Sequence, residues 1–521
     1  MPRQSALNPV AANSRLSPMQ RLLTLTSVAC LVLAGLAVTR APAASTDIAI
    51  SVHAGSREGQ LATRMGTQFA WPGSLDRTPD SRGRFDGFAP ALVRINATTD
   101  GLPGLPLVMP AGVTRGDWNF SNLDAIVNDV RGAGGLVVLD IAYAPQWMWD
   151  CSTGKIRDGS FAEFASYMTR VVSYYNVGSF IAEDGSTITN PAGTTNRIGY
   201  WELWNEPDLR TLGCPPGGNP NISPTEYVTM WNASAPAMLA VDPGIKLIGA
   251  ATSSAGTTNV PDYLPALMAN ATRKPDVVSF HAYGGWSNAQ TDRFFFDGDV
   301  GCCGIAGIER GLVQVQAEAP GIPVWITELN VNSGWSEDDP TQRPWNAFGA
   351  AWGASAFQRL ARHGAQAIFE FQFAHPSLHQ LSLIEIDTGR PLLPYWRDYY
   401  LARYFPPGST LVSASSSNPE VETLAVRPPG SSDVHVLVVN RQVDSEISTG
   451  GTGLPASVSV TLDDVPGIVG VTVRQIDSAT PLATGPDLRT MQGANSVTVD
   501  FSGYGLALIE FVTGPAPTAS P

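Results

Sequence analysis

The sequence predicts an α/β fold, namely a (β/α)8 TIM barrel followed by a C-terminal antiparallel β-sandwich. Eight short apolar or β-branched runs recur with helical patterns between most of them, and this alternation ends near residue 405. Alternation of strands and helices implies parallel strands, and eight such units close into a barrel. An open doubly wound sheet is the alternative, but the Gly-rich phosphate turn that usually follows its first strand is missing.

The predicted barrel strands are short and evenly distributed. They cover residues 66–71, 92–98, 136–144, 198–205, 245–252, 277–283, 324–329 and 367–373. Between them, residues 122–130 carry apolar side chains at the spacing of one buried helical face. Ser160–Glu163 and Ser223–Glu226 match the capping box, which predicts that a helix begins at each. Two last helices are expected at 346–363 and 394–404.

The pattern changes after residue 405. Apolar runs alternate there with Gly, Pro, Ser and Asp, at 421–426, 434–439, 456–462, 471–476, 496–501 and 505–512. Short strands at this spacing predict a β-sandwich over residues 405–514. The N-terminal segment 44–60 contains an alternating stretch, 48–52, that we expect to join this sandwich as an edge strand. The barrel then covers 61–404, and 515–521 is expected to be a disordered tail.

Residues 1–43 have the pattern of a secretory signal peptide. Arg15 and Arg21 precede an apolar run from Leu22 to Val38, and Ala41-Pro42-Ala43 follows as a small-x-small cleavage site. An uncleaved membrane anchor is the alternative, because this run of 17 residues, three of them Thr or Ser, reaches the short limit for a span. The sequence therefore predicts a secreted or periplasmic protein that has no membrane partner once the signal is removed.

Charge and cysteine content narrow the possible partners. The net charge is −14 and only 15% of residues are charged, which argues against a nucleic-acid partner, since that requires a basic face. Four cysteines remain after the signal, and an even number in an exported chain permits disulfides. Adjacent Cys302 and Cys303 favour a vicinal bridge, which leaves Cys151 to pair with Cys214. Free thiols are the alternative.

Two glutamates stand at the ends of predicted barrel strands. Glu206 lies in the run Trp204-Asn205-Glu206-Pro207 after the fourth strand, and Glu328 lies in Ile326-Thr327-Glu328-Leu329 on the seventh. Barrel active sites lie at the C-terminal ends of strands, so both side chains are expected to face one cleft. Two carboxyl groups, one protonated and one ionised, are what the hydrolysis of a glycosidic bond requires.

These boxes resemble those of clan A of the glycoside hydrolases, and other segments are most similar to family 39, the β-xylosidase and α-L-iduronidase family. Tyr143–Trp147 resembles that family's strand-three end, and Glu226–Pro243 resembles its fourth helix and following turn. The resemblance covers about residues 61–440. It implies a retaining hydrolase that acts on oligo- or polysaccharides by double displacement and needs no cofactor.

The resemblance also implies roles for single residues. Glu206 matches the general acid/base, Glu328 the nucleophile, and Asn205 the residue that binds the sugar 2-hydroxyl. His281 and Tyr283 match the His-x-Tyr that ends strand six, where the tyrosine contacts the nucleophile. Arg94, on strand two, matches a position from which a cation would hold Glu328 ionised. On strand eight, where clan members often have a Trp under the sugar, this sequence has Glu370-Phe371-Gln372-Phe373.

Trp147, Trp286 and Trp335 fall on predicted loops after strands three, six and seven, and are candidate platforms for sugar rings, with ordinary packing as the alternative. Two other functions use the same scaffold: a non-catalytic carbohydrate-binding surface protein, and a transglycosylase with the same glutamates. The sequence predicts no metal site. The sugar, the linkage and the oligomeric state are left open.

Overall fold

The computed structural model describes residues 47–68, 72–97, 107–209, 222–255, 262–299, 302–375, 381–465 and 467–514. The predicted signal peptide, Cys214 and the predicted C-terminal tail lie outside these residues. Among the described helices, none combines the length and the apolar character needed to cross a lipid bilayer.

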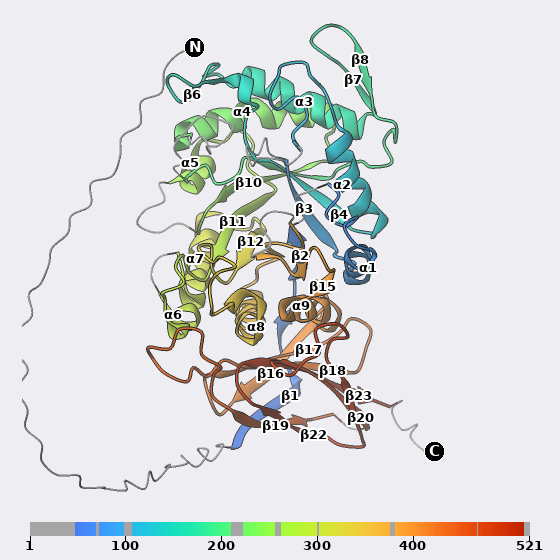
Figure 1. Cartoon of the computed structure of the whole chain (residues 1–521), viewed down its shortest axis with the longest axis vertical. Coiled ribbons are helices and arrows are strands. Elements are labelled where there is room, and N and C mark those ends of the chain that lie inside the picture. The colour runs from blue at the N-terminus through green and yellow to red at the C-terminus, as the bar shows by residue number, and fades with distance from the viewer. Residues whose placement is uncertain are drawn as a thin grey trace, which may run out of the picture. The chain divides into compact units, whose positions relative to one another are not determined.

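Eight parallel strands form a closed barrel (Figure 1). They are β2 (Arg64–Gln68), β3 (Leu92–Ala97), β4 (Leu136–Ile141), β9 (Tyr200–Leu203), β10 (Lys246–Thr252), β11 (Val277–Tyr283), β12 (Val324–Asn330) and β13 (Ala367–Glu370). Each pairs with the next strand along the chain, and β13 closes on β2. Leu92, Val138, Ile248, Trp325 and Phe369 fill the interior. The predicted barrel is therefore confirmed, with most strands a few residues shorter than predicted.

Helices surround the barrel. They are α1 (Pro79–Phe88), α2 (Ser121–Gly132), α3 (Ala162–Asn176), α4 (Pro224–Val241), α5 (Tyr263–Asn270), α6 (Asp292–Asp297), α7 (Ile305–Glu318), α8 (Ala347–Arg362) and α9 (Leu393–Tyr404), with 3-10 turns at Gln146–Met148 and Arg343–Trp345. The Ser223–Glu226 capping box is present at the start of α4. The Ser160 capping box was wrong, because α3 begins one residue later, after Phe161 in a left-handed conformation. Asp158 instead accepts the Glu163 N–H at 2.9 Å.

Three small two-stranded ribbons, two between barrel strands and one after the last barrel strand, were not predicted. They are β5–β6 (Trp149–Asp150, Lys155–Ile156), β7–β8 (Ser179–Ile181, Thr187–Thr189) and β14–β15 (Ile384–Glu385, Arg390–Pro391). Strands of two or three residues are too short to show a periodic pattern in sequence.

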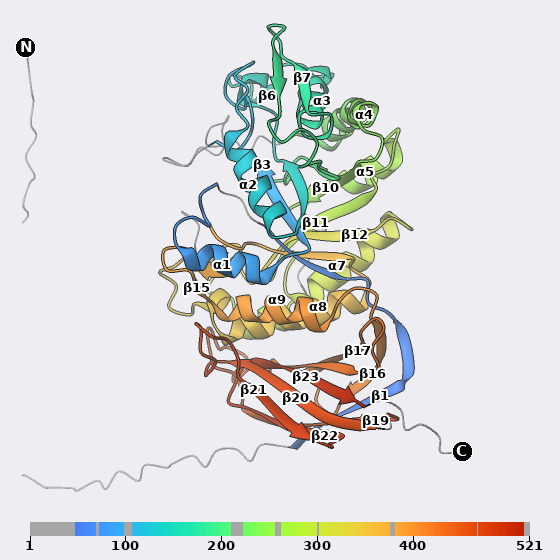
Figure 2. The same cartoon turned by 90° about the vertical axis from the view of Figure 1, so that its right-hand side faces the viewer.

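The C-terminal region is a single nine-stranded sheet that curls over its own core, as the lower layers of Figure 2 show. Its strands are β1 (Asp47–Gln60), β16 (Thr410–Ser416), β17 (Val421–Arg427), β18 (Val434–Asn440), β19 (Ala456–Asp463), β20 (Ile468–Asp477), β21 (Leu488–Gln492), β22 (Ser496–Phe501) and β23 (Gly505–Thr513). We expected β1 at an edge, but it lies inside the sheet, antiparallel to β16 and parallel to β19. The sheet is therefore not wholly antiparallel.

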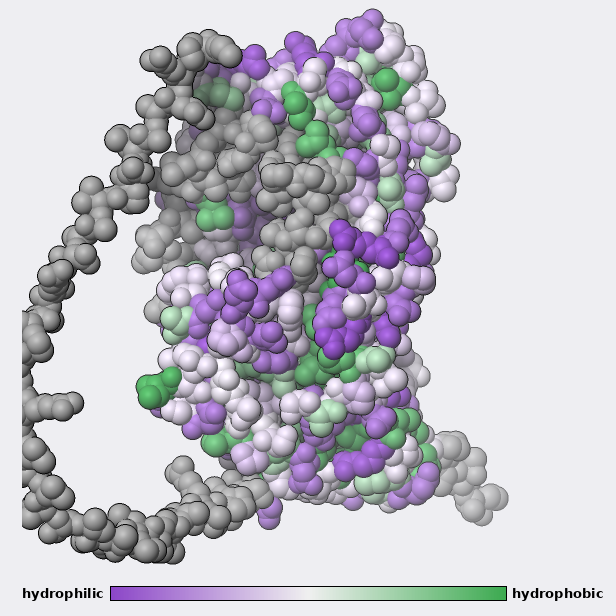
Figure 3. Space-filling model, viewed as in Figure 1, coloured by the Kyte–Doolittle hydropathy of each residue, from purple (hydrophilic) through white to green (hydrophobic). Residues whose placement is uncertain are grey.

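The barrel and the sheet share a hydrophobic core. Phe357 and Leu360 of α8, with Leu401 of α9, belong to the same buried cluster as Leu437 and Leu508 of the sheet. On the face shown in Figure 3, hydrophobic residues of the described part are scattered or lie in narrow bands among hydrophilic ones, rather than in one broad patch. The apolar face of the sheet is thus covered by the barrel helices.

Polar contacts add to this interface. Asp292, at the start of α6, accepts the N–H groups of Gly450 and Gly451 in a sheet loop, at 2.9 and 2.7 Å. Arg441 donates to Asp297 of α6 at 2.8 Å and to Glu422 of β17 at 2.7 Å. The two parts of the chain are therefore joined by directional bonds as well as by apolar packing.

Candidate active site

The backbone places Glu206 just beyond the end of β9. Asn205 N–H donates to Ala142 O at 2.9 Å and Glu206 N–H to Ala251 O at 2.8 Å, so this segment is held between the ends of β4 and β10. Glu206 has φ 44° and Trp204 has φ 76°. Such left-handed conformations are uncommon outside glycine and cost of order 1–3 kcal/mol each, and they cluster at functional sites.

The carboxylate of Glu328, on β12, is held by three side chains. Arg94 Nη1 donates to Oε1 at 2.8 Å, and Tyr283 O–H donates to Oε2 at 2.7 Å. His281 Nδ1 lies 3.4 Å from Oε2. Burial raises the pKa of Glu328, and the charges of His281 and Arg94 oppose that rise. Arg94 thus contacts Glu328 where the resemblance placed it and favours the ionised form, although burial outweighs its effect.

His281 bridges the two glutamates. Its Nδ1 lies 2.8 Å from Glu206 Oε1, and its ring is fully buried. Burial by itself lowers the pKa of His281, but the charge of Glu328 and the hydrogen bond to Glu206 outweigh it and raise that pKa. The shift favours the protonated imidazolium, whose Nδ1–H donates to Glu206 and lies within ion-pair distance of Glu328.

The two glutamates face each other across a short gap. One carboxylate oxygen of Glu206, one of Glu328 and a ring nitrogen of His281 all lie within 4.8 Å of one another. That spacing also suits a divalent metal ion. However, Arg94 already pairs with the Glu328 carboxylate, and His281 donates a hydrogen bond to Glu206. The chain itself therefore supplies the positive charge that these two carboxylates need. The side chain of Glu206 is the more exposed of the two, at 15% against 7%.

Arg94 is the centre of a buried polar network under the site. Its guanidinium is fully buried, lies 2.8 Å from Asn205 Oδ1, and contacts Glu202 at 2.6 Å and Asp140 at 3.0 Å. Gln68 accepts a further bond at 2.6 Å. Three carboxylates therefore share one guanidinium, and burial raises the pKa of Asp140 well above its usual value.

No site role was assigned from the sequence to Gln68, Asp140, Glu202 or Ser279. Ser279 O–H donates to Glu202 at 2.5 Å, so Glu202 is bonded from two sides. The available signal was the polar residue near the end of an otherwise apolar strand, because a barrel interior admits a polar side chain only with a partner. These four residues lie on β2, β4, β9 and β11, and the closed barrel joins them in one network around Arg94 and Glu202.

Strand eight supplies an aromatic side chain despite its departure from the clan pattern. Phe371 follows β13 directly, is half-buried, and lies edge-on to Tyr283 with ring centroids 6.2 Å apart. Glu370 contacts Arg397 of α9 at 2.8 Å. The tyrosine that holds Glu328 is therefore packed by Phe371.

The three candidate tryptophans differ from one another. Trp335 is buried against Trp345, with centroids 4.7 Å apart, so it offers no open ring face. Trp147 is half-buried, its indole N–H donates to Ala111 O at 2.8 Å, and Arg115 lies over its ring. Trp286 is 53% exposed. None of the contacts described here joins these rings to Glu206 or Glu328, so their assignment as sugar platforms stays a prediction.

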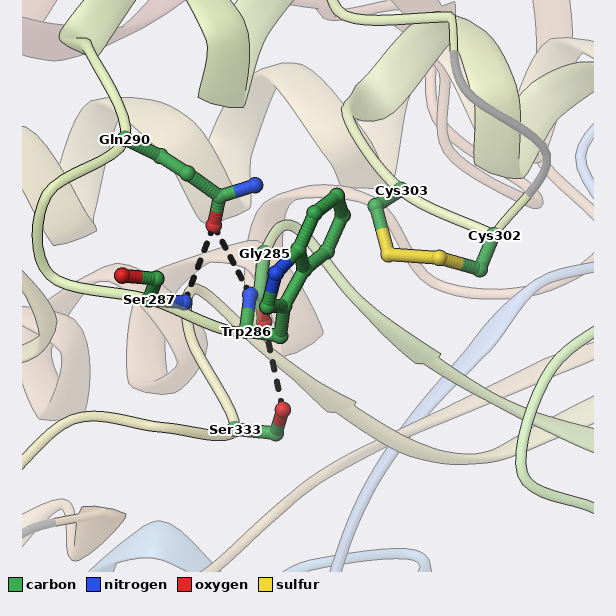
Figure 4. Close-up of a disulfide and its surroundings, with 7 residues drawn as sticks. All are labelled: Gly285, Trp286, Ser287, Gln290, Cys302, Cys303 and Ser333. Carbon is green, nitrogen blue, oxygen red and sulfur yellow. Dashed lines mark hydrogen bonds between the residues drawn. A yellow bond between two sulfur atoms is a disulfide. The ribbon is translucent and has the colours of Figure 1, made fainter.

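The structure joins Cys302 and Cys303 by a disulfide between neighbours in sequence (Figure 4). The predicted partner of Cys151, Cys214, lies outside the described residues, so the 151–214 pairing stays a prediction. Figure 4 shows the indole of Trp286 beside the 302–303 bridge.

The sequence matches the family model for glycosyl hydrolases family 39 over residues 113–356. This range includes Asn205, Glu206, His281, Tyr283 and Glu328, and leaves out Arg94. No curated protein matches the chain in sequence.

Solved structures of glycosidases share the fold at low sequence identity. The family 39 enzyme from Xanthomonas axonopodis pv. citri superimposes with a TM-score of 0.63 at 16% identity, over 92% of this chain and 99% of that one. A glucosidase from Croceicoccus marinus gives 0.62 at 16%, over 90% and 100%. A monomeric β-xylosidase from Caulobacter crescentus CB15 gives 0.61 at 15%, over 89% and 99%. These likenesses show the shared fold, and the family match with the paired glutamates supports a glycoside hydrolase of the clan A type, most similar to family 39.

Proposed function

We propose that the chain is an exported retaining glycosidase in which Glu328 is the nucleophile and Glu206 the general acid/base. The observation that carries the proposal is that one carboxylate oxygen of Glu206 and one of Glu328 lie within 4.8 Å of each other, a short gap of the kind that retention needs. Retaining enzymes have carboxyl groups about 5–5.5 Å apart, whereas inverting enzymes need about 6.5–9.5 Å to admit a water molecule.

The first step forms a glycosyl-enzyme. An oxygen of Glu328 bonds to the anomeric carbon while the glycosidic C–O bond breaks, and the proton of Glu206 moves to the leaving oxygen. Arg94 and Tyr283 hold the Glu328 carboxylate by its two oxygens and fix its direction of attack. The more exposed Glu206 is placed to reach the leaving group.

The second step releases the sugar. Glu206, now ionised, takes a proton from water, the water oxygen bonds to the anomeric carbon, and the bond to Glu328 breaks. His281 donates to Glu206 and, when protonated, favours the ionised form of Glu328. Asn205, fixed by Arg94, is the residue assigned to the sugar 2-hydroxyl.

The substrate is proposed at the level of its class, an oligo- or polysaccharide. Structural neighbours include proteins described as a β-xylosidase and a glucosidase, which makes nitrophenyl β-xylosides and β-glucosides the first members of a test panel. The decisive measurement is proton NMR of the sugar released within the first minutes. Retention predicts the anomer of the substrate, and the opposite anomer as first product would refute the assignment.

Export is the second part of the proposal and rests on the signal-like pattern of residues 1–43. Expression in a bacterial host, followed by N-terminal sequencing of the protein from the periplasm or medium, tests it. A mature N-terminus near Ala44 supports cleavage, whereas an intact N-terminus in the membrane fraction would support the uncleaved anchor.

A further inference from the structure

Trp286 is an exposed aromatic side chain on a rigid backbone. Trp286 N–H and Ser287 N–H both donate to Gln290 Oε1, at 2.9 and 3.0 Å. Gly285 O accepts from Ser333 N–H at 3.0 Å and from its hydroxyl at 3.2 Å, which joins the turn to the loop after β12 (Figure 4). An indole that is half exposed loses much of the free energy that full burial would supply. Because the backbone of the turn is fixed, the ring cannot move to a buried position.

The loop after β12 is pressed against this turn. A Cβ on Gly334 would come within 2.2 Å of Trp286 O, so only glycine fits there. Phe294 of α6 lies edge-on to the indole, with ring centroids 5.5 Å apart and planes at 89°. The indole is thus supported at one edge.

The vicinal disulfide is fixed to the same turn. Gly304 N–H, directly after Cys303, donates to Gly284 O at 2.8 Å. Figure 4 shows the two sulfur atoms beside the Trp286 ring. A disulfide between neighbours closes a small ring of covalent bonds whose sulfur atoms are apolar and polarisable. Cys303 is buried and Cys302 is partly exposed, so the bridge offers its Cys302 side next to the exposed indole.

This surface lies close to the reacting groups. Tyr283, which donates to Glu328, is separated from Trp286 by only Gly284 and Gly285, so the two Cα atoms are at most about 11 Å apart. The turn follows the C-terminal end of β11, which is the face of the barrel that carries the catalytic groups. The turn therefore lies at the same end of the barrel as the reacting groups.

We propose that Trp286 and the Cys302–Cys303 disulfide together form a platform on which a sugar unit next to the reacting one stacks. Pyranose rings present apolar C–H faces, and a rigid aromatic surface binds such faces without paying an ordering cost. This inference rests on the proposed glycosidase function, because it names how the same site holds a chain longer than one sugar.

Binding to a protein with silenced hydrolysis tests the platform directly. In a Glu328→Gln background, isothermal titration calorimetry would be run with xylo- and cello-oligosaccharides of two to five units. We expect Trp286→Ala to weaken binding of the better series about tenfold for the longer chains, and Trp286→Phe to give an intermediate loss. Cys302→Ser with Cys303→Ser should weaken it about threefold. Ile447→Ala, an exposed side chain in a sheet loop, is the matched control and should change nothing.

Chemical reduction of the Cys302–Cys303 disulfide is an independent test of the platform. Dithiothreitol transfers two electrons and two protons to the bridge, yields two thiols, and itself becomes a cyclic disulfide. The loss of affinity should equal that of the double serine variant, and the serine variant itself should not respond. Circular dichroism and the melting temperature of each variant show that it is folded.

The outcomes separate the platform from the proposed function. Unchanged affinity in Trp286→Ala, or no oligosaccharide binding at all by the silenced protein, overturns the platform. A loss in Trp286→Ala without any loss in the double serine variant overturns the part assigned to the disulfide. If the wild type hydrolyses no glycoside while Trp286-dependent binding persists, the function proposal fails and the platform stands.

Discussion

Glu206 and Glu328 have the same chemistry, and their surroundings distinguish them. Glu328 is buried and held by Arg94 and Tyr283, whereas Glu206 is more exposed and touches His281. The difference leads to opposite expectations when each side chain is removed and a small anion is supplied in its place.

Azide should rescue Glu206→Ala on a dinitrophenyl glycoside. This leaving group needs little protonation, so the first step survives, and azide needs no general base to attack the glycosyl-enzyme. The product should be a glycosyl azide with the substrate's own anomeric configuration. On a substrate with a poor leaving group the same variant should lose about 10²–10⁴-fold in kcat.

Azide with Glu328→Ala provides the contrast. There it would attack the substrate directly, so any glycosyl azide should have the inverted configuration. Product NMR and kinetics on both variants decide the assignment. Retained azide product from Glu328→Ala, with no response from Glu206→Ala, would reverse the roles of the two glutamates.

Glu202 should set the acidic limit of activity through Arg94. Glu202→Gln keeps an acceptor for Arg94 and Ser279 but removes one of the negative charges around the guanidinium. Removing a negative charge near Glu328 lowers its pKa, so the acidic limb of the kcat/KM profile should move to lower pH, by about 0.5–1 unit. Gln68→Ala, which changes no charge, serves as the comparison. An acidic limb that moved upward in Glu202→Gln would contradict this account of the network.

Some residues of the site could be predicted from the sequence and others could not. Glu206, Glu328, His281, Tyr283, Asn205 and Arg94 were named in advance, and the structure brings them together. Asp140 and Ser279 were not named, because a single polar residue in an apolar strand carries no motif, and only the closed barrel shows that Asp140 bonds Arg94 and Ser279 bonds Glu202. Trp335 was named for its loop position, but neighbouring Trp345 buries it.

At the scale of elements, long amphipathic helices and buried strands were predictable, since the spacing of their apolar residues reflects which face packs against the core. The short two-stranded ribbons and the start of α3 were not predictable. At α3, Asp158 competes with Ser160 for the free N–H groups of the first turn and bonds Glu163 N–H, so the chain did not use the Ser160 capping box. A capping motif is thus decided by which of several nearby oxygens reaches the helix.

The packing of α8 against α9 depends on one missing side chain. A Cβ on Gly353 would lie 1.8 Å from Arg397 Nη1, and Arg397 is buried in ion pairs with Glu370 and Asp398. Gly353→Ala should therefore destabilise the fold by about 1–3 kcal/mol or more, because it displaces a buried, paired cation. The melting temperature measures the loss.

Gly132→Ala is the control for this prediction. Gly132 is also helical, at the end of α2, and a Cβ there meets nothing within 4 Å. Alanine is a better helix former than glycine, so this variant should be as stable as the wild type or slightly more stable. Equal melting temperatures for the two variants would show that Arg397 moves aside at little cost.

At the scale of the whole molecule, the barrel and the sheet should unfold together. They share one hydrophobic cluster and are joined by Asp292 and Arg441. Calorimetry should show one transition for the mature protein, and a chain that ends at residue 405 should fail to give a soluble, folded barrel. Two separate transitions would mean that the interface is weaker than its contacts indicate.

Strand β1 is synthesised long before the strands with which it pairs. Its Ala49 N–H bonds to the Ser417 side chain, 368 residues later. At about 5–20 residues per second, synthesis of the intervening chain takes roughly 20–70 seconds, during which β1 has no partner strand. An alternating strand left open for so long is a template for pairing with other chains. β1, the first strand among the described residues to be synthesised, is thus among the last to find its partners, and until then other proteins that bind the nascent chain must keep it from pairing wrongly.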